Sequence, residues 1–265
     1  MPIADSPPVQ ITYVGGPTTV LEIAGVRFIT DPTFDAPGRD YDLGAVTLHK
    51  LGAPALQPEQ LGKLDVALVS HEQHPDNLDD AGRALLAKIP VVLTAPTSAK
   101  KLPRAVGLAP GSSQRIDTKQ GVTLTVTATP ARHGPVGAEQ MAGEVIGFLI
   151  NVAQTGETLA YVTGDTVWYA GTREVAERYK PRVVLAHYGG ARTSRAPFYV
   201  TMNTNDVIET AAAFPAAKIF PIHHDGWAHF TQNQQELIAA FTKLGHDAQL
   251  QPVEPGKTYT FARQK

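Results

Sequence analysis

Residues 65–77 read DVALVSHEQHPDN, and this stretch decides how the fold is interpreted. Its first six residues form a continuous apolar run, which is typical of a strand that is covered on both faces of a sheet. His71, His74 and Asp76 follow directly after that run. In open α/β sheets, ligands bind outside the carboxyl ends of strands, because loops and helix N-termini converge there. The stretch therefore predicts a buried strand that delivers imidazole and carboxylate groups to a functional site.

Several other predicted strands end in the same kind of residue. The residues that follow these strands are Asp31, His133, Asp165, His187, and the pair His223 and His224. A lone His at a strand end is usually held by backbone hydrogen bonds, and a lone Asp is usually a helix N-cap. Both explanations stay open for each residue taken alone. The joint pattern favours a metal site or an acid–base site, and imidazole with carboxylate but without thiolate suits Zn, Mn or Fe.

The remaining runs predict an α/β fold. Residues 10–14, 18–23 and 26–30 are short and rich in β-branched residues, which predicts an antiparallel meander. Residues 145–152 and 159–163 predict a hairpin around Thr155-Gly156. Further buried strands are expected at residues 65–70, 90–94, 183–186 and 218–222, and helices at residues 79–89, 172–179, 205–214 and 235–244.

Two of these segments have a clear period. Residues 122–129 alternate between apolar residues and Thr, which predicts a half-buried strand with one polar face. Residues 235–244 have the period of an amphipathic helix, and Gly245 supplies a C-cap. The apolar stripe of this helix consists of Leu237, Ile238, Phe241 and Leu244.

The order of the elements predicts a single α/β domain over residues 1–265, with two mixed sheets between helical layers and two similar halves. Residues 35–54 and 191–200 contain no predicted element. Long loops inside a compact domain often carry function, so we expect both stretches to contribute to the site.

The composition excludes several classes of protein. The chain has 265 residues, of which 43% are hydrophobic and 18% charged, and its net charge is −2. It lacks the basic field that nucleic acid or an anionic membrane requires. The absence of Cys removes disulfides, thiolate ligands and Cys nucleophiles. No signal peptide or membrane span is visible, so we expect a cytoplasmic protein with a small-molecule substrate, and a homo-oligomer stays open.

Taken together, these motifs resemble the metallo-β-lactamase superfamily, and they are most similar to its ascorbate-6-phosphate lactonase-like branch of metal-dependent hydrolases. Residues 11–32, ITYVGGPTTVLEIAGVRFITDP, resemble the entry hairpin of that branch. SHEQHPDN occupies the place of the His-x-His-x-Asp-His motif, His133 that of the next lone His, Asp165 that of the bridging Asp and His223 that of the final His. The resemblance covers residues 10–261 and implies a four-layer αβ/βα sandwich of two mixed sheets flanked by helices.

The first motif departs from the family pattern. When the motif is aligned on His-x-Asp, His74 and Asp76 match and Glu72 replaces the first His. When it is aligned on the strand end, His71 is the first His, Gln73 falls on the second, and one residue is inserted before Asp76. We favour His71 and His74 as the ligand pair.

In both alignments Asn77 replaces the last His of the motif, which normally serves the second metal. An amide oxygen binds metal more weakly than imidazole and suits a harder ion. This replacement favours either one well-made metal site or a pair of metal sites that prefers Mn to Zn.

The resemblance implies a divalent-metal centre with one or two ions, Zn or Mn. His71, His74 and His133 would hold the first ion, and Asp76, Asp165 and His223 the second, with Asp165 bridging. Hydroxide on the metal would cleave an ester, lactone or phosphoester bond of a small substrate, because metal binding lowers the pKa of water from 15.7 to about 7. Asp76 and Asp165 are the expected catalytic residues, and Asp76 would also accept the proton of the nucleophile.

Other residues are expected around this centre. The expected substrate contacts are His187, His224 and Asn77, although His187 could instead orient a ligand or make a purely structural hydrogen bond. His224 also rivals His223 as the ligand. Trp227 and His229 are expected in the pocket wall, and Asp31 is expected to hydrogen-bond a ligand His. Arg192 and Arg195 could bind an anionic group or lie in solvent. His49 and His246 are expected on the surface.

A second class of function stays open. Gln73 and Asn77 favour a catalytically degenerate protein that keeps the fold and binds a ligand without hydrolysing it. A nuclease is less consistent with the acidic balance of the chain. A serine hydrolase would need a G-x-S-x-G elbow, and the sequence has none.

Overall fold

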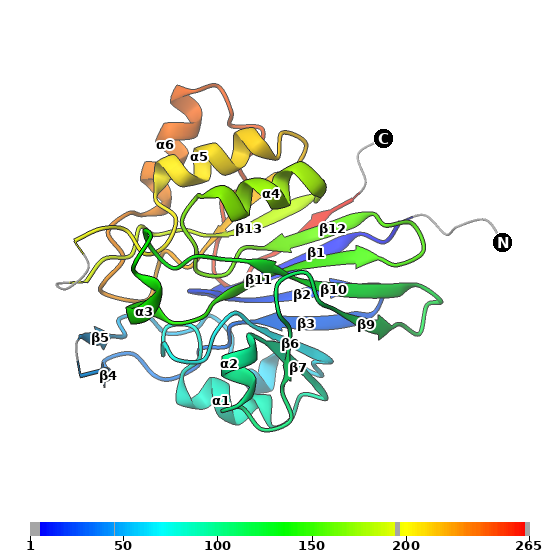
Figure 1. Cartoon of the computed structure of the whole chain (residues 1–265), viewed down its shortest axis with the longest axis horizontal. Coiled ribbons are helices and arrows are strands. Elements are labelled where there is room, and N and C mark those ends of the chain that lie inside the picture. Colours follow the sequence, from blue (N-terminus) through cyan, green and yellow to red (C-terminus); the bar gives the residue numbers. More distant parts are fainter. Residues whose placement is uncertain (1–5, 45, 194–196, 263–265) are drawn as a thin grey trace.

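The apolar strands of the sequence form two mixed sheets that lie face to face. The computed structural model describes residues 6–44, 46–193 and 197–262. Figure 1 shows both sheets between layers of helices. Large apolar side chains from both sheets, among them Phe28, Phe148 and Phe220, are buried in the cluster between them. The predicted four-layer α/β sandwich is therefore confirmed.

The first sheet joins an antiparallel part to a parallel part. The antiparallel meander of β1, β2 and β3 is confirmed, and β3, β6 and β7 run parallel. Every residue of β6 is buried, as predicted for the strand that precedes His71. In sheet order the strands are β15 (Thr258–Phe261), β1 (Val9–Gly15), β2 (Thr18–Ile23), β3 (Val26–Thr30), β6 (Val66–Val69), β7 (Val91–Thr94) and β8 (Val106–Gly107).

The second sheet has the same mixed construction. Its parallel part consists of β14, β13 and β12, and its antiparallel part contains the predicted hairpin of β11 and β12. In sheet order the strands are β14 (Lys218–Ile222), β13 (Val183–His187), β12 (Thr158–Val162), β11 (Ile146–Val152), β10 (Thr123–Pro130) and β9 (Ser113–Asp117). Two similar halves were predicted, and the two sheets show them.

Helices cover the outer face of each sheet. The predicted inward side chains of α1, Leu85 and Leu86, are buried under the first sheet. Within the described part of the chain, no helix is long and apolar enough to cross a membrane. The helices on the first sheet are α1 (Asp80–Leu86) and α2 (Pro96–Ala99), and those on the second are α4 (Ala170–Arg178), α5 (Thr204–Ala213) and α6 (Gln234–Lys243).

One strand differs from its prediction. The alternation in β10 predicted one polar, solvent-exposed face, but Thr127 and Thr129 on that face are only 8% and 2% exposed. The hydroxyl groups of Thr127 and Ser113 form a hydrogen bond across the neighbouring strands. Thr is compatible with a covered sheet face because its methyl group can pack there, and the hydroxyl group of Thr127 is satisfied by this bond. The half-buried interpretation was therefore wrong.

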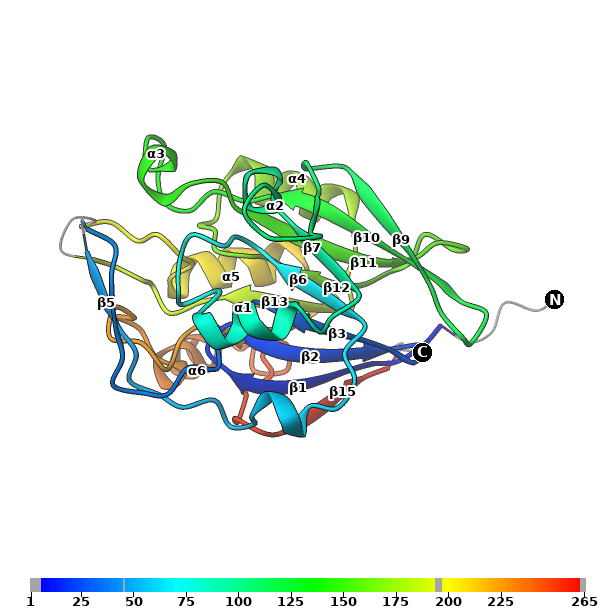
Figure 2. The same ribbon diagram turned by 90° about the horizontal axis from the view of Figure 1, so that it is seen from below.

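The stretch at residues 35–54 contains more structure than the sequence suggested. It forms a small hairpin of β4 (Asp40–Asp42) and β5 (Thr47–His49). A short helix, α3 (Glu139–Ala142), follows His133. Figure 2 shows that the hairpin and α3 lie at the same end of the two sheets. This end is where the candidate site is found.

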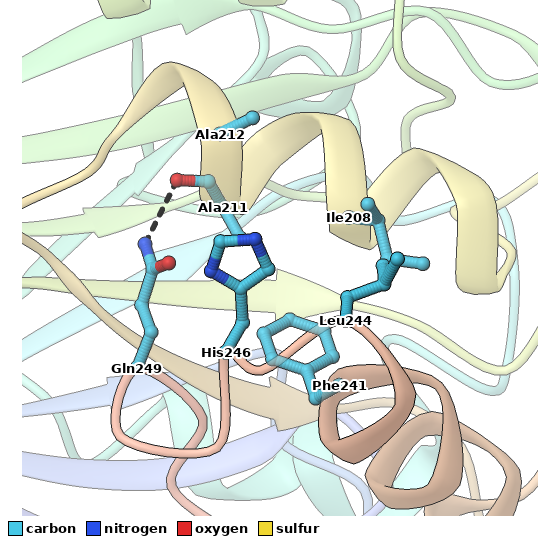
Figure 3. Close-up of a pocket in the computed structure, with 7 residues that line it drawn as sticks. All are labelled: Ile208, Ala211, Ala212, Phe241, Leu244, His246 and Gln249. Atoms are coloured by element: carbon cyan, nitrogen blue, oxygen red, sulfur yellow. Dashed lines mark hydrogen bonds between the residues drawn. The ribbon is translucent and has the colours of Figure 1, made fainter.

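The apolar stripe of α6 is only partly buried. Leu237 and Phe241 are 0% and 1% exposed, whereas Leu244 is 51% exposed. Figure 3 shows Leu244 at the edge of a small hollow between α5 and α6, next to Ile208 and Phe241. Gly245 has a φ of 71°, so the predicted glycine C-cap is confirmed.

The difference in burial between Leu237 and Leu244 allows the contribution of core packing to stability to be tested. We expect Leu237→Ala to lower the free energy of unfolding by about 3 kcal/mol, because it removes a buried side chain and leaves a cavity. Leu244→Ala should cost less than about 1 kcal/mol, because half of that side chain is already in water. Urea unfolding of both variants measures the difference, and equal losses would contradict the burial described for α6.

Candidate metal centre

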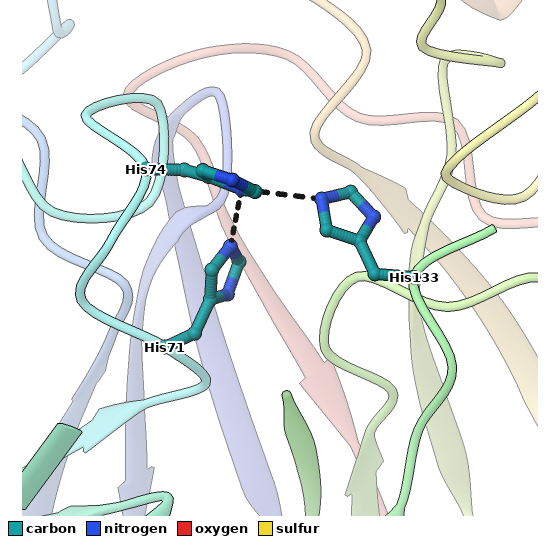
Figure 4. Close-up of side chains that lie close together, drawn as sticks. All are labelled: His71, His74 and His133. Atoms are coloured by element: carbon teal, nitrogen blue, oxygen red, sulfur yellow. Dashed lines mark hydrogen bonds between the residues drawn. The ribbon is translucent and has the colours of Figure 1, made fainter. Parts of the chain in front are cut away.

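Three histidines converge where β6 ends and where the loop after β10 passes over it. His74 Nδ1 lies 2.9 Å from His71 Nε2 and 3.2 Å from His133 Nε2. Figure 4 shows the rings of His71 and His133 both pointing at His74. His71 is 0% exposed and His133 is 6% exposed. The three predicted ligands of the first metal therefore lie together.

The proton on His133 can be placed from its contacts. His133 Nδ1 lies 2.6 Å from the carbonyl oxygen of Val200. A carbonyl oxygen only accepts, so Nδ1 carries the proton and Nε2 keeps a lone pair. This lone pair is the one directed at His74.

A chain of hydrogen bonds through Ser70 determines which ring nitrogen of His71 carries the proton. The Ser70 hydroxyl donates to Asp31 Oδ2 at 2.9 Å, and the Ser70 backbone N–H donates to Asp31 Oδ1 at 2.6 Å. The Ser70 oxygen, 2.9 Å from His71 Nδ1, therefore accepts from His71. Asp31 was expected to bond a ligand His directly, but it reaches His71 through Ser70. Ser70 was missed, because the sequence presented it only as the last residue of a strand.

The three histidine rings cannot satisfy all of one another's nitrogen lone pairs. His71 and His133 each direct a lone pair at His74 Nδ1, which carries at most one proton, so at least one lone pair lacks a partner. Burial is the main cause that lowers the pKa of all three, and it lowers the pKa of His133 to about 3. Neutral rings with converging lone pairs suit a cation. Tetrahedral Zn–N bonds of 2.0–2.1 Å would hold ligand atoms about 3.3 Å apart, close to the observed separations.

A second group lies beside the first. His223 Nε2 is 3.4 Å from Asp76 Oδ2, and His223 Nδ1 is 3.6 Å from Asp165 Oδ1. Asp76 Oδ1, Asp165 Oδ2 and both ring nitrogens of His223 are buried without a hydrogen-bond partner. Buried polar atoms are normally satisfied, so four such atoms in one place fit a ligand of opposite charge. The three predicted ligands of the second metal are thus also brought together.

Asp165 lies between the two groups. Its Oδ1 is 3.6 Å from His223, and its Oδ2 is 3.7 Å from His133 Nε2. Burial raises the pKa of Asp165, and the carboxylates of Asp76 and Asp31 raise it further. A cation near Asp165 would remove this cost of ionisation. The placement is the one that the sequence predicted for a bridging carboxylate.

The pKa of Asp76 is shifted in the opposite direction from that of Asp165. Burial alone would raise its pKa, but His229 and His223 outweigh burial and bring the pKa well below its usual range. His229 Nε2 lies 3.0 Å from Asp76 Oδ2, which leaves Oδ1 available. His229 therefore orients this carboxylate as well as lying in the pocket wall, where the sequence placed it.

Among the described residues, two of the four non-Gly residues with a positive φ lie at the strand ends of the centre. Asp31 has a φ of 29° and His223 a φ of 62°, both in the left-handed region that non-Gly residues rarely adopt. The His223 N–H donates to the Gly16 carbonyl oxygen at 2.7 Å, which holds the turn. Such strain is often found at functional sites, and here it aims His223 at both carboxylates.

The structure distinguishes between the two alignments of the first motif. Glu72 points away from the histidines and forms ion pairs with Arg83 at 2.9 Å and Lys101 at 2.6 Å. Gln73 donates to the Ala142 carbonyl oxygen at 2.9 Å. His71 and His74 are left as the pair that faces the centre, in agreement with the strand-end alignment.

The three expected substrate contacts all lie outside the lining of the cavity that borders the centre. His187 is fully buried, 3.1 Å from Asp31 Oδ2, and Asn77 is fully buried and donates to Asp165 Oδ1 at 3.1 Å. His224 stacks on Tyr13 with 6.1 Å between ring centroids. His187 and Asn77 thus pack against residues of the centre from outside this cavity, and His224 packs against Tyr13.

That cavity has a volume of about 340 Å³ and borders His74, Asp76 and His133. His229 lines it as predicted, whereas Trp227 packs on Tyr41, 5.5 Å between ring centroids, and lines a different hollow.

The remaining predicted residues lie away from the centre. The guanidinium group of Arg192 lies 4.2 Å from the ring centroid of Tyr199, and Arg192 does not line the cavity. Arg195 lies outside the described residues. His49 and His246 are exposed, as predicted. The structure thus gives no support to an anion site at Arg192.

The sequence and the fold of the chain are similar to those of several known proteins. A family model described as a β-lactamase superfamily domain matches residues 26–224. UPF0173 protein YddR of Bacillus subtilis (strain 168) is 27% identical over 95% of this chain and 100% of its own length. A UPF0173 metal-dependent hydrolase of Polaromonas sp. is 28% identical over 77% of this chain and 75% of its own length.

Among solved structures, the fold is similar to that of an isothiocyanate hydrolase from Delia radicum gut bacteria. The TM-score is 0.81 at 21% identity, with 96% of this chain and 100% of the other covered. At this identity the likeness supports the fold.

Proposed function

Since the chain belongs to the β-lactamase superfamily, we propose that it is a divalent-metal-dependent hydrolase that cleaves an ester, lactone or phosphoester bond of a small substrate. The homologues are named metal-dependent hydrolases. The observation that carries the proposal is the pair of adjacent groups of three candidate ligands. Five of the six residues are buried, and the second group has four unsatisfied polar atoms. A lactone substrate would agree with the family branch that the sequence resembles.

Each group of residues has a proposed part in metal binding. His71, His74 and His133 would hold one ion. Asp76, Asp165 and His223 would hold the other, with Asp165 reaching both. Imidazole with carboxylate suits Zn or Mn. Asn77 is not needed as a ligand in this arrangement, because its amide group orients Asp165.

When bound, the metal supplies Lewis acidity, which makes a water molecule acidic near neutral pH and polarises the bond to be cleaved. The chain supplies the rest. Asp76 Oδ1 has no hydrogen-bond partner, and Asp76 lines the cavity, so we infer that this oxygen accepts the proton of the attacking water. His229 holds Asp76 Oδ2 and thereby fixes the direction of Oδ1.

Removal and return of the metal test this function. Protein stripped with dipicolinate and reloaded with Zn or Mn would be assayed with a p-nitrophenyl ester, a γ-lactone, bis-p-nitrophenyl phosphate and an alkyl isothiocyanate. We expect hydrolysis of at least one substrate to fall at least about 100-fold on stripping and to return on reloading, because the metal supplies several kcal/mol of stabilisation.

Two outcomes would contradict the proposal. Hydrolysis that is unaffected by stripping would remove the metal from the reaction. Tight metal retention without hydrolysis of any substrate in the panel would favour the ligand-binding protein instead.

A further inference from the structure

The cavity beside the candidate ligands has apolar walls. Apart from Thr193, His229 and the three candidate ligands, every described residue that lines it is Leu, Val, Met or Ala. These walls come from the β4–β5 hairpin, the α3 region and the loop after β13. The apolar side chains of the walls include Leu43, Val46, Leu48, Met141, Ala191 and Val200.

Two of these side chains are unusually exposed. Leu43 is 40% exposed and Met141 is 64% exposed, and they belong to segments far apart in the sequence. Exposed apolar side chains that border one another often mark a binding surface. Both line the cavity that borders His74, Asp76 and His133. The exposed apolar surface is therefore continuous with the proposed reaction centre.

The charges around the cavity indicate what it can bind. Among the described residues that line it, none is Lys or Arg, and the carboxylate is that of Asp76, a candidate metal ligand. An anionic group placed against Leu43, Val46 and Leu48 would lose hydration without gaining a partner. A neutral apolar group would instead bury its surface and that of the wall.

The volume of the cavity limits the size of the apolar group that it can bind. An engineered apolar cavity of about 150 Å³ binds benzene in another protein. A volume of about 340 Å³ is roughly twice as large. It is at the small end of the range for ligand pockets, which is about 300–1,000 Å³. The scissile group and one phenyl ring or short alkyl chain would fill it.

We propose that the substrate carries an uncharged apolar group next to the scissile bond, and that Leu43, Leu48 and Met141 select for it. This inference rests on the proposed hydrolase function and narrows it to neutral carbonyl-type substrates such as apolar esters and lactones. Anionic phosphoesters are then poor substrates.

A series of p-nitrophenyl esters tests the selection in metal-loaded protein. From acetate to butyrate to hexanoate, kcat/KM should rise by up to about fourfold per methylene until the cavity is full. The anionic p-nitrophenyl glutarate monoester should fall at least about tenfold below the hexanoate, because its carboxylate must lose water. Leu43→Glu should flatten the series. Leu244→Glu places the same charge at a comparably exposed leucine just after α6 and should leave the series unchanged.

A binding measurement separates this inference from the proposed function. The neutral fluorophore N-phenyl-1-naphthylamine should bind the metal-free wild type and Leu244→Glu, and should bind Leu43→Glu at least about tenfold more weakly. If the esters are hydrolysed but kcat/KM does not rise with chain length, the inference is overturned and the hydrolase function stands. If none of these esters is hydrolysed, the substrate panel above decides the hydrolase function, and binding of the fluorophore decides the inference. Selective loss of fluorophore binding in Leu43→Glu then supports the apolar site, and absence of binding to the wild type overturns it.

Discussion

Asp165→Asn should lower kcat/KM by about a thousandfold while leaving the metal-free protein folded. Asp165 is 3.6 Å from His223 and 3.7 Å from His133, so it is the side chain that reaches both groups of candidate ligands. The amide removes the negative charge that would hold two cations together, and loss of several kcal/mol of metal-derived stabilisation corresponds to about three decades in rate.

The stability of the same variant gives a second, independent readout. Burial and the carboxylates of Asp76 and Asp31 raise the pKa of Asp165, so its negative charge is unfavourable without a cation. The metal-free variant should therefore unfold at a Tm no lower than that of metal-free wild type. Metal at a thousand times its Kd should stabilise the wild type by about 4 kcal/mol, and most of this gain should be lost in the variant.

Asp117→Asn is the matched control, since Asp117 is exposed on β9 and pairs with Thr123, at the opposite end of β10 from the loop that carries His133. It should change neither activity nor the gain from metal. Full activity of Asp165→Asn, or a metal-free variant that no longer folds, would contradict the bridging role.

His133→Ala should remove one metal equivalent and lower kcat/KM by about a thousandfold. His133 supplies one of the three imidazole nitrogens of the first group, and its ring is already oriented by the Val200 carbonyl oxygen. Two imidazoles hold Zn or Mn far more weakly than three. His133 lies in a loop after β10, so its removal should spare the sheet.

Metal content and single-substrate kinetics would be measured together in this variant. His246→Ala is the control, because His246 is an exposed histidine beyond α6. Unchanged metal content in His133→Ala would contradict the assignment of the first group. A loss of metal in His246→Ala would show that the assay reports adventitious surface binding.

Much of the fold could be predicted because apolar runs and strand ends carry local information. The buried strand β6, the meander β1–β3 and the hairpin β11–β12 each follow from patterns of a few residues. Whether the threonine face of β10 is exposed could not be predicted from such a local pattern. Whether Thr127 and Thr129 meet water depends on what packs over the sheet, and that is decided by residues far away in the sequence.

The sequence likewise predicted some features of the candidate site and missed others. Strand ends identified the six residues that converge, because parallel strands deliver their final side chains to one edge of a sheet. The sequence did not reveal that His187 and Asn77 lie behind them, nor that Ser70 links Asp31 to His71. A polar side chain after a strand can face either the cavity or the core, and only the packing of the neighbouring loops decides between these directions. The apolar wall from the β4–β5 hairpin was missed for the same reason.

Metal stoichiometry per chain is the most direct test of the two adjacent ligand groups. Elemental analysis would be made on protein that was stripped, incubated with excess Zn or Mn and dialysed. We predict close to two equivalents, because each group of three candidate ligands has its own set of unpaired lone pairs or charges. A protein that retains no metal with either ion would contradict the account.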